Sequence, residues 1–159
     1  MRQRPNRFDI QQPPFHRPLR RVQHQHIEIF RVQFCQVREP HSAGPHDVVF
    51  IEPKGRLTVE TEADFVATVR RLLDAGRTRL VLNLADVPYI DSSGLGAIAH
   101  TYTSAWRRGG DLKLLNVKAR NRQVLAVTKL LTVFEVFESE EEAVRSFAGN
   151  QIAHPAVSA

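Results

Sequence analysis

The sequence is poor in cysteine and has no long apolar run. Cys35 is the only cysteine among 159 residues, which excludes a disulfide framework and a cysteine-based metal site within one chain. Such cysteine usage suits a reducing compartment, and we expect a cytoplasmic protein. No apolar stretch approaches the roughly 20 residues of a membrane-spanning helix, and the first residues lack the apolar core of a secretory signal. We therefore expect neither a membrane span nor export.

An excess of positive charge is absent from most of the chain. The formal net charge is +5, and residues 1–46 account for all of it, with 8 arginines against 3 acidic residues. Residues 47–159 hold 14 basic and 14 acidic residues, so we expect no direct nucleic-acid partner for this part. Residues 1–46 are also rich in proline, glutamine and histidine, and a segment of this composition cannot bury much surface. We predict a disordered basic leader over residues 1–25 and a flexible tail over residues 151–159.

Metal and cofactor sites are not indicated either. His24 and His26 stand one residue apart, without acidic or cysteine partners at ligand spacing. The sequence therefore predicts no metal site and no cofactor.

Apolar periodicity predicts one domain of alternating strands and helices over residues 26–150. A capping box is expected at Thr61–Asp64 and another at Ser139–Glu142, each opening a helix. Gly76 is expected to end the first of these helices. The expected strands are residues 26–37, 47–53, 78–84, 111–117 and 133–137, with the first two as a hairpin, and the other expected helices are residues 92–107 and 120–131. This order predicts an α/β fold with a mixed, mostly parallel sheet flanked by helices.

The stretch "VLNLADVPYIDSSGLGAIAHTY", residues 81–102, changes from a buried-strand pattern to helical spacing. Asp91 and Ser92 lie at that junction. The first N–H groups of a helix lack partners and carry partial positive charge, so a phosphate on Ser92 would be tolerated there. Gly94 and Gly96 would leave the first turn open to another protein. On these residues alone, however, simple helix capping is the favoured interpretation.

The wider sequence resembles a known family. The block "VLNLADVPYIDSSGLGAIAH", preceded by "VVFIEPKGRL" and followed by "GGDLKLLNVKARNRQVLAVTKLLTVFEVFESEEEAV", closely resembles the signature of STAS domains. Bacterial anti-sigma factor antagonists and the cytoplasmic tails of sulfate transporters share this fold. The resemblance covers residues 47–148 and implies a single STAS domain.

The resemblance also implies a function and a site. Antagonists of this family bind an anti-sigma factor, a serine kinase of the histidine-kinase ATPase type, and so free a sigma factor for transcription. The kinase phosphorylates the hydroxyl residue directly after the aspartate, which is Ser92 here, and a phosphatase reverses the modification. The residues implied in partner binding are Asp91, Ser93, Gly94, Leu95 and Thr58. Thr58 stands where many members have aspartate, which leaves the kinase and the binding mode open.

Two other classes of function remain open. A STAS domain can instead act as a scaffold of a stressosome, or as an accessory subunit of a lipid or anion transport complex. An enzyme is not indicated, because Ser92 and His100 would lie roughly 80° apart around a helix and about 12 Å along it. "SSGLG" also lacks the lysine of a phosphate-binding P-loop. Trp106 and Phe134 are interpreted as packing residues, and we expect no catalytic residues.

Overall fold

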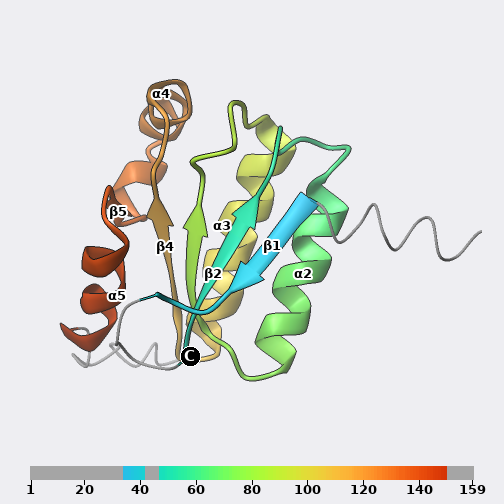
Figure 1. The fold of residues 1–159 in the computed structure, drawn as a ribbon. Coiled ribbons are helices and arrows are strands. Elements are labelled where there is room, and N and C mark those ends of the chain that lie inside the picture. The colour runs from blue at the N-terminus through green and yellow to red at the C-terminus, as the bar shows by residue number, and fades with distance from the viewer. Residues whose placement is uncertain (1–33, 42–46, 150–159) are drawn as a thin grey trace, which may run out of the picture.

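The computed structural model describes residues 34–41 and 47–149, which form one sheet with helices on both faces (Figure 1). The strands follow one another across the sheet in chain order, with the first antiparallel and the others parallel. They are β1 (Cys35–Arg38), β2 (Val48–Pro53), β3 (Arg79–Asn83), β4 (Asp111–Leu115) and β5 (Val136–Phe137). The helices are α2 (Glu62–Asp74), α3 (Ser92–Arg107), α4 (Ala119–Val127), the 3₁₀ helix η1 (Leu130–Thr132) and α5 (Glu140–Gly149). The predicted α/β class with a mixed, mostly parallel sheet is confirmed.

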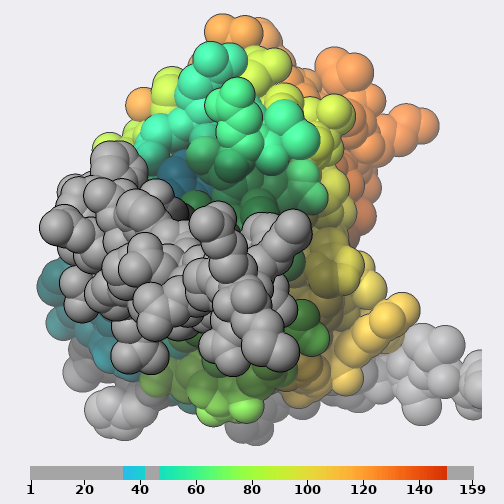
Figure 2. All heavy atoms as spheres, turned by 90° about the vertical axis from the view of Figure 1, so that its right-hand side faces the viewer, coloured from blue at the N-terminus to red at the C-terminus, as the bar shows by residue number. Residues whose placement is uncertain are grey.

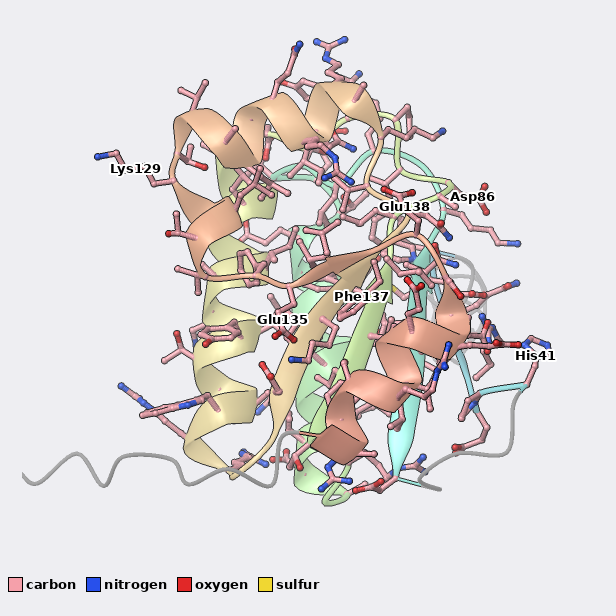
Figure 3. All side chains as sticks on the ribbon, turned by 90° about the vertical axis from the view of Figure 1, so that its left-hand side faces the viewer. His41, Asp86, Lys129, Glu135, Phe137 and Glu138 are labelled. Carbon is pink, nitrogen blue, oxygen red and sulfur yellow. The ribbon has the colours of Figure 1, made fainter. Side chains whose placement is uncertain are left out.

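The two faces of the sheet are covered unequally. Helices α2 and α3 pack on one face, and α5 covers the other (Figures 1 and 3). Leu80 and Leu82 of β3 face the larger core, whereas Val81 faces the smaller core beneath α5. Because β3 is buried on both faces, its sequence is a continuous apolar run instead of an alternation. Phe134 is buried and meets the Tyr102 ring in a T-shaped contact, with 5.4 Å between the ring centroids, which confirms its packing role.

Some boundaries differ from the sequence predictions. Of the strand expected over residues 26–37, β1 begins at Cys35, and residues 26–33 lie outside the described residues, as do the predicted leader, the tail, His24 and His26. The expected hairpin with β2 is present. Helix α4 ends at Val127, short of the expected residue 131, because Lys129 adopts a left-handed backbone with φ of 58°. Gly76, with φ of 79°, follows the end of α2 as predicted.

The capping box predicted at the start of α2 is wrong. Thr61 occupies the N-cap position, but its side chain makes no capping hydrogen bond to the helix. Its hydroxyl instead donates to the carbonyl oxygen of Arg56 at 2.8 Å and accepts from the Thr58 N–H at 3.0 Å. Thr61 therefore folds the loop between β2 and α2, which lies beside Ser92.

Helix α5 begins at Glu140, as the second capping box predicted, but its first turn is held from β1. The Glu140 carboxylate accepts two hydrogen bonds from the Arg38 guanidinium, at 3.1 and 2.8 Å, and a third from the His41 backbone N–H at 2.9 Å. Arg38 also stacks over the Phe50 ring, 4.3 Å from its centroid. These contacts join the first strand to the last helix.

Among the helices of the described residues, none combines the length and apolar character needed to cross a membrane.

Candidate functional site

Ser92 is the first residue of α3 and is exposed at the edge of the sheet where the parallel strands end. Two loops meet beside it, the loop after β2 and the loop after β3. Leu57 and Ile90 form an isolated parallel bridge, and the Asp91 N–H donates to the Leu57 carbonyl oxygen at 3.2 Å. The start of α3 is therefore attached to the loop between β2 and α2.

The Asp91 carboxylate joins the same two segments through its side chain. One oxygen accepts from the Gly94 N–H at 2.9 Å and caps α3, while the other accepts from the Val59 N–H at 3.1 Å. The hydrogen bond from Gly94 is the main reason why the pKa of Asp91 lies below its usual range, with further contributions from Val59 and the charge of Arg56. Asp91 therefore remains ionised at neutral pH and places a fixed negative charge next to Ser92.

Gly94 belongs to the interior of this junction, which corrects its expected exposure to a partner. A β-carbon at this position would lie 2.4 Å from the Leu57 carbonyl oxygen and 3.0 Å from a methyl carbon of Ile90. Glycine is required here because α3 passes directly over the Leu57 backbone. Gly96, two residues further along, is exposed, and a β-carbon added there would meet no other atom within 4 Å. The expectation of an unobstructed helix surface applies to Gly96 alone.

The implied partner residues divide between surface and interior. Ser92 is exposed, and Ser93 and Leu95 are half-buried. Thr58 is only 9% exposed, because its backbone closes the turn that leads into α2, so little of it is available for contact. Its neighbour Val59 is 67% exposed beside the Asp91 carboxylate, and the sequence analysis did not identify it. A single valine in a loop carries no pattern that could have revealed it.

A hollow of about 410 Å³ adjoins Asp91 on the side of the β2–α2 loop. Figure 2 shows this loop in blue-green, standing out at one end of the molecule. The hollow combines apolar and charged groups. Its lining includes Phe34, Lys54, Arg56, Val59, Glu60 and Tyr89. Aromatic residues and arginine, here Phe34, Tyr89 and Arg56, are enriched in protein contact surfaces.

His100, the histidine considered as a base for Ser92, belongs to another part of α3. His100 lines a separate hollow of about 280 Å³ between α2 and α3, together with Arg70 and Leu73. Within residues 34–41 and 47–149, no three histidine, cysteine, aspartate or glutamate side chains are arranged to hold a metal ion.

Comparison with known proteins agrees with this architecture. A protein of Thermotoga neapolitana, named provisionally as an anti-sigma factor antagonist, is 31% identical over 104 residues, or 65% of this chain and 92% of that protein. A crystal structure from Thermotoga maritima, with the same provisional name, has a TM-score of 0.65 at 26% identity and covers 73% of this chain and 96% of that one. The Bacillus cell fate determinant SpoIIAA in its phosphorylated form has a TM-score of 0.55 at 22% identity, covering 71% and 98%, which shows a shared fold. The family model of the STAS domain matches residues 39–143, so the chain belongs to the STAS domain family.

Proposed function

We propose that this protein is an anti-sigma factor antagonist that binds a serine kinase of the histidine-kinase ATPase type and is released when that kinase phosphorylates Ser92. The observation that carries the proposal is the exposed hydroxyl of Ser92 at the first position of α3, directly after the N-cap Asp91. The names of the relatives support the general role. In this role the protein is a cytoplasmic substrate and switch without catalytic residues of its own.

The structure supports a switch that acts on binding and leaves the fold intact. The Ser92 side chain is exposed, so a phosphate displaces nothing from the core, and the positive end of the α3 dipole stabilises it. The phosphate adds about −1.5 to −2 charges beside the Asp91 carboxylate, whose lowered pKa keeps it ionised. A partner surface that packs on neutral Ser92 must then desolvate this charge. A tenfold loss of affinity needs only about 1.4 kcal/mol.

The test is phosphorylation in vitro by the histidine-kinase-type ATPase encoded nearest to this chain in its genome. Intact-mass and peptide mass spectrometry after incubation with ATP should show one phosphate on Ser92. Ser92→Ala should abolish it, while Ser93→Ala, the matched variant one residue along the same turn, should retain it. Absence of phosphate with every neighbouring kinase would refute the proposal and favour the scaffold or transport-accessory alternatives.

Binding provides the second measurement. Isothermal titration calorimetry with the same kinase should show that Ser92→Asp and phosphorylated protein bind at least about tenfold more weakly than unmodified protein. Treatment of the phosphorylated protein with a serine phosphatase should restore affinity. Equal affinity of Ser92→Asp and wild type would contradict release by charge.

A further inference from the structure

We infer that Arg56 and Arg120, both stacked on Tyr89, form a docking element that binds carboxylate groups on the kinase partner. The inference rests on the proposed function, because it assigns a second contact to the same partner. The proposed switch at Ser92 acts by charge repulsion, whereas the docking element adds an attractive contact with the same partner.

The arginines come from different parts of the chain and converge on one ring. The guanidinium carbon of Arg56 lies 4.8 Å from the Tyr89 ring centroid, and that of Arg120 lies 4.9 Å from it. The two guanidinium carbons are therefore no more than about 10 Å apart. The Tyr89 carbonyl oxygen accepts the Leu57 N–H at 3.0 Å, which attaches this loop to the segment that carries Arg56. The three side chains are held in place before a partner arrives.

Neither guanidinium forms a salt bridge within the described residues, although the charge of Arg56 contributes to the lowered pKa of Asp91. Five other arginines of the described residues do form one, in the pairs Arg38–Glu140, Arg77–Glu39, Arg79–Asp47, Arg108–Asp74 and Arg122–Glu138. Two positive charges on one aromatic ring both attract a negative group that approaches it. The two oxygens of a carboxylate match the fork of a guanidinium group.

The surroundings favour an acidic protein surface over nucleic acid. The hollow beside Arg56 also contains Lys54, exposed Val59 and the acidic Glu60. Asp86 lies next to the same loop, since its carbonyl oxygen accepts the Gly55 N–H at 3.0 Å, and Figure 3 shows it near the start of α4. These carboxylates would repel a continuous polyanion such as RNA or DNA. An aromatic ring contacted by two cations, with exposed Val59 beside one of them, suits a protein surface with a few localised carboxylates.

The experiment compares charge reversals at the docking element with one at the other end of α4. The test variant is Arg56→Glu with Arg120→Glu, and the control is Lys129→Glu. Figure 3 shows Lys129 projecting from the opposite end of α4. Arg120 lies in the first turn of α4, where the helix dipole disfavours positive charge, so Arg120→Glu should not destabilise the fold. Circular dichroism should confirm that all variants melt like wild type.

Affinity for the purified nearest-encoded kinase is then measured by calorimetry at about 0.05 and 0.15 M NaCl. The double variant should bind at least about tenfold more weakly than wild type at the lower salt, and its affinity should depend less on salt. Lys129→Glu should change affinity less than about twofold.

Three results would overturn the inference. One is equal affinity of the double variant and the control. Another is a double variant that loses binding to a labelled 20-mer DNA but keeps its affinity for the kinase, which would assign the element to nucleic acid. The third is a wild type that does not bind the kinase, which removes the proposed function as well. If Ser92→Asp binds like wild type while the double variant is weakened, the docking element stands and the phosphorylation switch fails.

Discussion

The same substitution at two glycines of α3 should have opposite effects on stability. Gly94→Ala places a β-carbon 2.4 Å from the Leu57 carbonyl oxygen, whereas Gly96→Ala places one in open space. Alanine is favoured over glycine in a helix by about 1 kcal/mol, and both variants gain this contribution. Only Gly94→Ala must move the backbone it contacts, and overpacking of this kind costs about 1–3 kcal/mol or more.

We expect Gly96→Ala to raise the free energy of unfolding by up to about 1 kcal/mol. Gly94→Ala should lower it by up to about 2 kcal/mol, because the overpacking cost exceeds the helix gain. Urea denaturation followed by circular dichroism measures both changes, and unchanged slopes would show that the unfolded state is unaffected. Equal stability of the two variants would refute the close approach of α3 to the Leu57 backbone.

Two further substitutions test the junction and the contact between β1 and α5. Asp91→Ala should lower the free energy of unfolding by about 1 kcal/mol or more in urea denaturation, since it removes the cap of α3 and the bond to Val59. Asp91→Asn keeps one acceptor oxygen, so it can retain only one of the two bonds and should lose less than Asp91→Ala. Equal losses would show that the charge matters more than the remaining bond. Arg38 lowers the pKa of Glu140 from 4.5 to about 2, so this carboxylate contributes stability above pH 4.5 that is lost as the pH falls towards 2. Glu140→Gln should be about 1 kcal/mol less stable at pH 7 and should lose this part of the pH dependence, whereas the exposed Glu141→Gln should behave like wild type. Identical pH profiles of Glu140→Gln and wild type would contradict the ion pair.

The described sheet and its helices could largely be predicted from the sequence, because their signals are local. The run from Leu80 to Leu82 is apolar without alternation, as a strand buried on both faces requires. Helix α3 begins at Ser92 and ends at Arg107, as its apolar spacing and the following glycines indicated. The resemblance to STAS domains then identified Ser92 as the candidate site.

Contacts between loops far apart in the sequence were decided only by the tertiary structure. Val59 and Asp91 are 32 residues apart, and no local pattern indicates that one carboxylate joins them. The same holds for the stacking of Arg56 and Arg120 on Tyr89. Lys113 lies in an apolar strand and is only 1% exposed, yet it is paired with Asp111 and Glu135. Apolar periodicity depends on neighbours along the chain and so predicts the elements. The environment of a side chain at the carboxyl edge depends on how the loops after β2, β3 and β4 meet, which only the folded sheet determines.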